Sequence, residues 1–145
     1  LTAEDRNVTA ILELGTRHGS TFQIAQAYVP EIRDGDKRII VVEGEPVGAV
    51  LRTPLHWETR ANFHVGGTAV KSALTPRDRE ICARIGPMLR EFGIVFAGID
   101  VIGRWLTEVN VTSPTGIQEI NRLDGVVLER QVLDAVERRK RALGG

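Results

Sequence analysis

Residues 94–102 form one segment that is apolar at every position except Gly98 and Asp100. A continuous apolar run of this length, rich in β-branched residues, is typical of a strand buried on both faces. Residues 105–111 alternate more clearly between polar and apolar side chains, which predicts an antiparallel partner strand. The first strand is too apolar for an exposed edge, so we expect the hairpin to lie within a sheet.

Three side chains of this hairpin carry oxygen atoms that could share one site. Glu108 and Asn110 are two residues apart on one strand, so they point to the same face. Asp100 shares that face only if the numbers of directly opposed residues add to an even sum. A two-residue turn at Gly103 and Arg104 gives an odd sum, whereas a three-residue connection or a bulge places Asp100 opposite Glu108. A shared site therefore requires a three-residue connection or a bulge.

These three side chains are candidate ligands of a magnesium ion, which prefers oxygen donors and takes its other ligands from phosphates and water. Acidic residues on strands are also typical of a solvated edge, and their spacing alone leaves both interpretations open. Two features favour the metal site. The preceding strand is strongly apolar, and residues 111–115 form a turn whose hydroxyl and backbone N–H groups can hold an anion.

The remaining pattern predicts an α+β fold, with a mostly antiparallel sheet flanked by helices. Val8, Ile11 and Leu12 have the spacing of a short amphipathic helix that ends near Gly15 or Gly19. The further expected elements are strands at residues 21–29, 37–42 and 46–51, a turn at Gly44 and Glu45 between the last two, and helices at residues 76–92, 117–121 and 127–143.

The helix that follows residue 75 has a well-defined start. Thr75 can cap it, Pro76 suits its first position, and Asp78 completes a capping box. Cys82, the only cysteine, lies on the apolar side of this helix, and we interpret it as a core residue. Residues 53–72 show neither the helical nor the strand periodicity of apolar side chains. A segment of that length without regular structure is usually functional or mobile.

Charge and composition argue against several other classes of protein. The 145 residues include 19 lysines and arginines and 19 aspartates and glutamates, and this balance argues against a nucleic-acid-binding protein, which usually has a basic excess. The basic residues 138–141 fit the last turn of a helix better than a phosphate-binding or membrane-binding patch. No apolar run is long enough for a bilayer, and the acidic start has no signal-peptide character. We therefore expect a cytoplasmic protein without a membrane or nucleic-acid partner.

Three segments, in order along the chain, resemble signatures of prokaryotic glutathione synthetase, a family of the ATP-grasp superfamily. They are residues 28–38 for its mid-domain signature, residues 58–62 with Gly66 and Gly67 for its flexible loop, and residues 98–103 with 106–115 for its C-terminal signature. Three ordered motifs are more specific than any one of them. The resemblance covers about residues 12–119, which is most of the chain.

The resemblance implies an ATP-dependent ligase that joins γ-glutamylcysteine to glycine through an acyl phosphate, with magnesium or manganese as cofactor. It also implies a homo-oligomer. The implied site residues are Asp100, Glu108 and Asn110 as metal ligands; Arg38 and Arg60 as catalytic residues at the phosphates; Gln26, Ala27, Tyr28, Val29 and Asn62 at ATP; and Arg52, Gly66, Gly67, Thr112 and Ser113 at the substrates. Arg52 could instead only end a strand, and Tyr28 could only pack; both alternatives stay open.

The sequence departs from the family in its loop and at its product end. Residues 55–57 stand where the family usually has small residues, and Gly116 stands where some members have cysteine. His56 and His64 have no preferred metal-binding spacing, so we assign them to the loop surface. These departures keep two alternatives open: another ATP-grasp peptide ligase, similar to the ribosomal-protein glutamate ligases, and a non-catalytic nucleotide-binding domain.

A second departure concerns the other half of the ATP site. The lysine strand and glycine-rich phosphate loop of an ATP-grasp fold, and the N-terminal substrate domain of the family, have no counterpart in residues 1–145. We therefore expect the chain to be one C-terminal ATP-grasp unit, which binds nucleotide weakly by itself and does not turn over.

Overall fold

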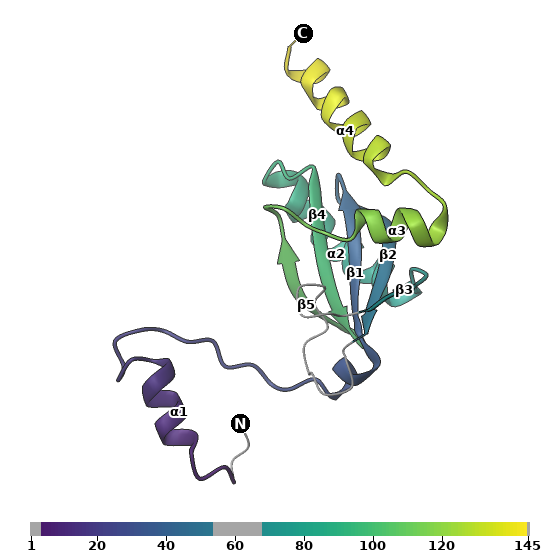
Figure 1. The fold of residues 1–145 in the computed structure, drawn as a ribbon. Coiled ribbons are helices and arrows are strands. Elements are labelled where there is room, and N and C mark those ends of the chain that lie inside the picture. Colours follow the sequence, from purple (N-terminus) through teal and green to yellow (C-terminus); the bar gives the residue numbers. More distant parts are fainter. Residues whose placement is uncertain (1–3, 54–67, 145) are drawn as a thin grey trace.

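The computed structural model describes residues 4–53 and 68–144. Its centre is a five-stranded antiparallel sheet with the strand order β3-β2-β1-β4-β5 (Figure 1). In chain order the elements are α1 (Val8–Gly15), the 3-10 helix η1 (Pro30–Asp34), β1 (Asp36–Val42), β2 (Glu45–Thr53), β3 (Thr68–Lys71), α2 (Pro76–Glu91), β4 (Phe96–Ile102), β5 (Trp105–Asn110), α3 (Ile117–Asp124) and α4 (Leu128–Leu143). The predicted α+β fold is confirmed.

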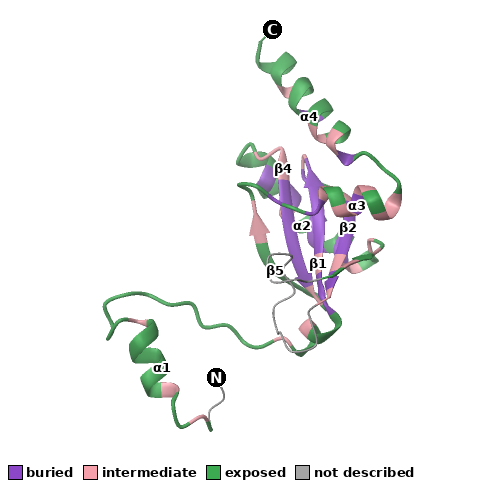
Figure 2. Cartoon of the chain, viewed as in Figure 1, coloured by how far each residue is buried: buried purple, intermediate pink, exposed green. Residues whose placement is uncertain are grey.

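Helices pack against both faces of the sheet, and the period of the strands decides which side chains each helix meets. Ile39 and Val41 of β1 point to the face that α2 covers, in a cluster with Ile81 and Leu89. The other face carries a second cluster with α3 and α4, formed by Ile40, Val42, Val50, Ile120, Leu128 and Ala135. Burial is concentrated in β1, β2 and β4, as Figure 2 shows.

The second face also continues toward the start of β1, where its side chains are charged. Asp36 and Arg38 precede Ile40 at intervals of two, so they share its face. The same strand therefore supplies apolar side chains beneath α4 and charged side chains at its opposite end.

The capping box of α2 is confirmed. The backbone N–H of Asp78 donates to the Thr75 hydroxyl at 3.2 Å, and the Thr75 N–H donates to the Asp78 carboxylate at 2.8 Å. Asp78 also accepts a hydrogen bond from Lys37 Nζ at 2.7 Å, which ties the helix start to β1. Burial opposes ionisation of Asp78, but these hydrogen bonds outweigh it and lower the pKa of its carboxyl.

Cys82 is fully buried in the cluster between α2 and the sheet, as predicted. Burial, together with the Asp78 carboxylate, raises the pKa of its thiol to about 11. We expect a thiol reagent at about pH 8 to modify the native chain at least roughly 100-fold more slowly than the urea-unfolded chain, because an unfolded thiol has a pKa of about 8.5. The stability that the protonated Cys82 thiol contributes is fully present below the unfolded pKa of about 8.5. It is lost as the pH rises through the folded pKa of about 11. Equal labelling rates in the two states would contradict this assignment.

Two predictions about strands are wrong. Residues 21–29 are extended and mostly exposed but belong to no strand, because no described segment pairs with their backbone. The region from 53 to 72 does contain a strand, β3, which is too short for an alternating pattern to identify it. The turn between β1 and β2 falls on Glu43 and Gly44, one residue earlier than predicted, and both residues have positive φ.

The N-terminal part of the described chain lies apart from the sheet. Helix α1 forms where the pattern predicts it but has no buried residue. Figure 1 shows it joined to the sheet only through the extended segment that precedes η1. Among the residues that the structure describes, no helix combines the length and the apolar content that a bilayer crossing needs.

Candidate functional site

Four charged side chains from three adjacent strands meet on one face of the sheet. Asp36 of β1 lies directly opposite Arg52 of β2, and Arg38 of β1 lies directly opposite Asp100 of β4. The strand register alone therefore places two acids and two bases in one group, which we call the ion-pair cluster. Each residue of this cluster is at most 7% exposed.

Asp100 is the centre of the ion-pair cluster. Arg38 donates to both of its carboxylate oxygens, from Nε at 2.5 Å and from Nη2 at 2.9 Å. Arg52 Nη2 reaches across β1 to the same carboxylate at 2.8 Å and also bonds to Asp36. The fork of a guanidinium suits such paired contacts, and the cluster as a whole balances two positive charges against two negative ones.

Asp36 and Arg52 have displaced pKa values. Burial, and then the negative charge of Asp100, raise the pKa of the Asp36 carboxyl, although Arg52 opposes this. Burial acts to lower the pKa of Arg52, but the carboxylates of Asp100 and Asp36 outweigh it and hold that pKa above its ordinary value. Asp36 Oδ1 is buried and accepts no hydrogen bond from residues 4–53 and 68–144. One buried carboxylate oxygen of the cluster is therefore left without a hydrogen-bond donor among the described residues.

Glu108 and Asp100 are directly opposed, as a shared site requires. The structure reaches this register through a bulge between Asp100 and Val101, while Gly103 and Arg104 keep the two-residue turn. Of the two solutions that the parity argument allows, the chain adopts the bulge. Glu108 is exposed, and its side chain makes no hydrogen bond or ion pair with the described part of the chain.

Asn110 organises the turn that follows β5. Its Oδ1 accepts hydrogen bonds from the backbone N–H groups of Thr112 and Ser113 at 3.2 and 3.4 Å, and it lies 3.4 Å from the Thr112 hydroxyl. This arrangement is a side-chain turn of the kind that asparagine favours. It brings the predicted substrate residues Thr112 and Ser113 directly beside the predicted metal ligand Asn110.

Arg38 connects the ion-pair cluster to the same turn. Its Nη1 donates to the Thr115 carbonyl at 3.3 Å. Gly98 on β4 lies opposite Asn110 and leaves the space through which Arg38 and Pro114 approach each other. The predicted metal-binding strand and the predicted substrate turn are therefore held by one arginine.

The change Gly98→Ala tests this close approach. An added Cβ would lie 2.7 Å from Pro114 Cβ and 3.0 Å from Arg38 Nη1, so the turn or the arginine must move. We expect the free energy of unfolding of the chain, measured by urea denaturation, to fall by about 1–3 kcal/mol. Gly144→Ala is the matched control, because its added Cβ meets nothing closer than 3.4 Å. A loss for Gly98→Ala no larger than that of the control would show that the contact is not tight.

The donor set can be tested against a magnesium ion. Asp100, Glu108 and Asn110 supply only oxygen donors on one face, which suits magnesium. These three residues do not complete a magnesium site by themselves. Asp100 is also bonded to two arginines. Within residues 4–53 and 68–144, no group of three or more His, Cys, Asp or Glu side chains gathers as a metal site. The residues therefore fit an ion that takes its remaining ligands from a bound phosphate and water, and they do not form a closed protein cage.

The other predicted site residues fall into two groups. Gln26, Ala27, Tyr28 and Val29 lie in the segment before η1, away from the sheet, so the described chain does not assemble an adenine pocket around them. Arg60, Asn62, Gly66 and Gly67 lie outside the described residues, as do His56 and His64.

Asp36 is the member of the cluster to which the sequence reasoning gave no role. Asp36 lies directly before the predicted strand at residues 37–42, and β1 begins one residue earlier, at Asp36, which places Asp36 on the same face as Arg38. Its partner Arg52 is 16 residues away in sequence, and only the register of β1 and β2 brings them together.

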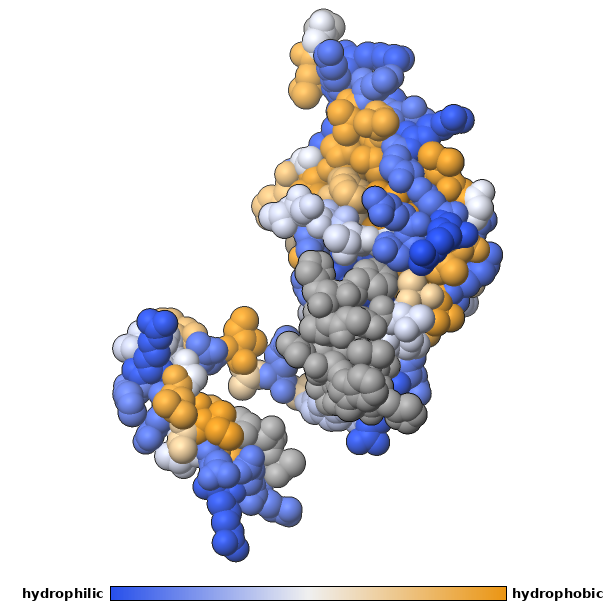
Figure 3. Space-filling view, viewed as in Figure 1, coloured by the Kyte–Doolittle hydropathy of each residue, from blue (hydrophilic) through white to orange (hydrophobic). Residues whose placement is uncertain are grey.

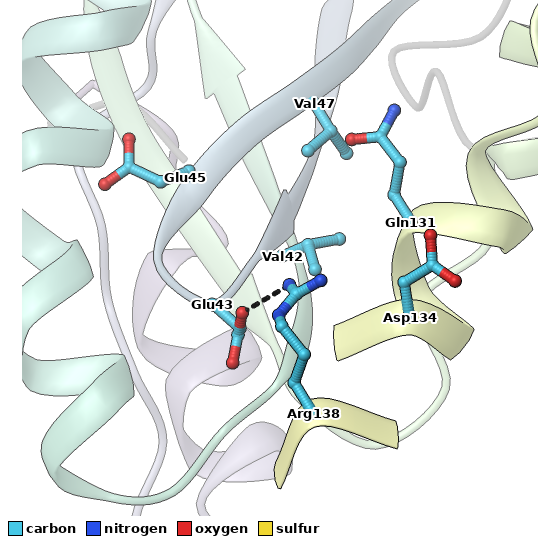
Figure 4. A pocket seen from close by; sticks show the side chains of 7 residues that line it. All are labelled: Val42, Glu43, Glu45, Val47, Gln131, Asp134 and Arg138. Atoms are coloured by element: carbon cyan, nitrogen blue, oxygen red, sulfur yellow. Dashed lines mark hydrogen bonds and ion pairs between the residues drawn. The ribbon is translucent and has the colours of Figure 1, made fainter. Parts of the chain in front are cut away.

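A shallow pocket lies at the other end of β1, between the β1–β2 turn and α4 (Figure 4). Its lining residues are Val42, Glu43, Glu45, Val47, Gln131, Asp134 and Arg138. Arg138 donates to Glu43 at 2.7 Å across it, and this hydrogen bond lowers the pKa of the Glu43 carboxyl. The pocket thus lies where α4 contacts the β1–β2 turn, and its lining contains none of the predicted site residues.

Comparison with known proteins gives a consistent family match. The family model described as prokaryotic glutathione synthetase, ATP-grasp domain, matches residues 1–125. The glutathione synthetase of Brucella melitensis biotype 1 is 55% identical over 139 residues, which cover 94% of this chain and 44% of that protein. The glutathione synthetase of Synechococcus elongatus is 54% identical over 133 residues, covering 92% of this chain and 41% of that protein. The chain therefore spans less than half the length of these relatives.

Proposed function

Because the chain belongs to the prokaryotic glutathione synthetase family, we propose that it forms part of an ATP-dependent ligase that joins γ-glutamylcysteine to glycine. The observation that carries the proposal is the ion-pair cluster around Asp100, which faces Glu108 on the sheet face beside the Thr112–Ser113 turn. The proposal includes a cytoplasmic, homo-oligomeric protein whose remaining active-site parts lie outside the described sheet.

The chemistry needs an activated carboxylate, because a carboxylate anion is a poor electrophile. In the proposed reaction a carboxylate oxygen of γ-glutamylcysteine takes the γ-phosphoryl group of ATP, ADP leaves, and an acyl phosphate forms. The glycine amine then attacks the acyl carbon, its C–N bond forms, the C–O bond to phosphate breaks, and the amine loses a proton. Such a reaction requires positive charge at the phosphates and exclusion of water.

We propose that Asp100, Glu108 and Asn110 hold the magnesium ion. When bound, the ion would neutralise negative charge on the phosphoryl oxygens. Arg38 orients Asp100 through its two hydrogen bonds and adds positive charge on the same face. The loop residue Arg60 would supply a further positive charge, and Arg52 a further donor on the substrate side.

The substrate and nucleotide ends of the site are assigned in the same proposal. Thr112 and Ser113 would bind the glycine or product carboxylate through the turn that Asn110 organises. The segment of residues 26–29 would contact adenine together with polypeptide that is not part of the described sheet, with Asn62 supporting the ATP site and Gly66 and Gly67 allowing the loop to close.

The test is the substrate dependence of ADP release in the full-length protein that contains this chain. We expect ADP release only when ATP, magnesium, γ-glutamylcysteine and glycine are all present. ADP release that depends on another acid–amine pair would instead identify another ATP-grasp peptide ligase. Nucleotide binding without ADP release for any pair would identify a non-catalytic domain. The isolated chain is the control, and we expect it to bind Mg–ATP weakly and to release no ADP.

A further inference from the structure

The turn between β5 and α3 carries no charged side chain of its own. Residues 111–116 are valine, threonine, serine, proline, threonine and glycine. Figure 3 shows pale surface, neither strongly hydrophilic nor strongly hydrophobic, where Figure 1 places this turn. The turn can therefore offer an anion only hydroxyl and backbone N–H groups. Positive charge reaches it from Arg38, whose Nη1 donates to the Thr115 carbonyl at 3.3 Å.

Two glycines enclose the Arg38 side chain. On β4, a Cβ added to Gly98 would lie 3.0 Å from Arg38 Nη1 and 3.2 Å from Arg38 Cδ. On the turn, a Cβ added to Gly116 would lie 3.1 Å from Arg38 Cγ. The arginine therefore runs through a slot, formed by Gly98 and Gly116, in which a larger residue on either side would press against it.

Gly98 imposes the stricter of the two limits. Its added Cβ would also lie 2.7 Å from Pro114 Cβ, and the ring of proline restricts how the turn can move away. The Arg38 Cγ that faces Gly116 belongs to a flexible side chain, so that contact relaxes more easily. Gly98 therefore fixes both the distance of the turn from the sheet and the position of the guanidinium beside it.

The same guanidinium is bonded to Asp100 through its other donors. Arg38 Nε and Nη2 donate to the two carboxylate oxygens at 2.5 and 2.9 Å, while Nη1 serves the Thr115 carbonyl. Gly98 precedes Asp100 by two residues on β4, so both lie on the same face of the sheet. A displaced arginine loses some of these contacts, because the donors of a planar guanidinium have fixed directions.

We propose that Gly98 is a positioning residue of the ligase reaction, which acts through Arg38 and Pro114 to hold the amine-binding turn beside the carboxylate of the metal site. The inference rests on the proposed function, in which Thr112 and Ser113 bind the glycine carboxylate. A wider separation of turn and sheet should therefore weaken binding of the amine substrate, and a displaced guanidinium should slow the chemical step.

The kinetic experiment compares Gly98→Ala with the parent in the full-length protein that contains this chain. We expect KM for glycine to rise about 10-fold or more and kcat to fall about 10-fold or more, while KM for ATP stays within about 2-fold of the parent. A variant that is only less stable contains fewer active molecules. That loss lowers the apparent kcat and leaves KM for glycine unchanged, so KM separates positioning from stability.

Gly125→Ala is the matched control. Gly125 ends α3 with a φ of 68°, so alanine strains the backbone there, but its added Cβ meets nothing within 4 Å. The control should lose stability without changing KM for glycine. Gly116→Ala is a second, milder variant, because its added Cβ meets Arg38 without meeting Pro114. We expect it to raise KM for glycine about 3-fold.

A second measurement does not depend on ligase activity. The Arg38 Nε–H is buried and bonded to Asp100, so its NMR signal, identified by its loss in Arg38→Lys, should exchange slowly with water. Gly98→Ala should accelerate this exchange about 10-fold or more, and Gly125→Ala less than about 2-fold.

Unchanged KM for glycine in Gly98→Ala would overturn the proposal, as would equal exchange rates in Gly98→Ala and Gly125→Ala. If Gly98→Ala does not fold, Gly116→Ala decides in the same way, by KM for glycine and by the exchange rate. A parent that releases no ADP with glycine would instead overturn the proposed function, and the exchange rates would still show whether Gly98 positions Arg38.

Discussion

Replacement of Asp100 by asparagine is expected to lower the free energy of unfolding of the chain by about 3–5 kcal/mol, which is the usual cost of removing one partner from a buried ion pair. Asp100 is only 3% exposed and accepts hydrogen bonds from both Arg38 and Arg52. Without its charge, two buried guanidinium groups remain beside a single carboxylate, that of Asp36. Urea denaturation followed by circular dichroism measures the loss.

Asp134→Asn provides the matched control for that measurement. Asp134 is exposed on α4, and its substitution should change the free energy of unfolding by no more than about 0.5 kcal/mol. If Asp100→Asn were as mild as this control, Asp100 would not be the centre of a buried cluster. In the full-length protein the same substitution should also abolish ligase activity, and the loss of stability contributes to that result.

Much of the hairpin that carries Asp100 and Glu108 was predictable from the sequence, because successive side chains of a strand alternate between the two faces of the sheet. The number sum of opposed residues must be even for the two carboxylates to share a face, and the structure satisfies this condition. The sequence could not choose between a longer connection and a bulge, because both solutions change the parity in the same way. That choice depends on local backbone geometry, which residue identity does not reveal here.

The ion-pair cluster was less predictable, since its contacts are long-range. Arg38 and Asp100 are separated by 62 residues, and each was assigned to a ligand rather than to the other. Their contact follows from the pairing of β1 with β4, two strands that are not adjacent in sequence. Pattern analysis identifies strands but contains little information about which of them become neighbours.

The strand predicted at residues 21–29 is absent for a related reason. Phe22 and Ile24 alternate with polar residues, which favours an extended conformation, and the segment is extended. A strand also requires backbone hydrogen bonds to a neighbour, and none of the described segments provides one. Phe22 is left entirely exposed, which is uncommon for a large apolar side chain.

Glu108→Gln should separate function from stability. Glu108 faces Asp100 across the hairpin, but it is exposed and makes no hydrogen bond or ion pair with the described residues. Its replacement should therefore change the free energy of unfolding by no more than about 0.5 kcal/mol. In the full-length protein we expect kcat/KM to fall roughly 100-fold or more, which corresponds to about 2.7 kcal/mol of transition-state stabilisation.

The loss should depend on the metal, because glutamine keeps the shape of the side chain and one oxygen donor but removes the charge that attracts the cation. Activity measured against magnesium concentration should show a higher half-saturating concentration for Glu108→Gln than for the parent. Glu91→Gln, at the end of α2 on the opposite side of the sheet, should alter neither quantity. Full activity and unchanged magnesium dependence in Glu108→Gln would remove this residue from the metal site, and the opposed register of Asp100 and Glu108 would then be a feature of the fold alone.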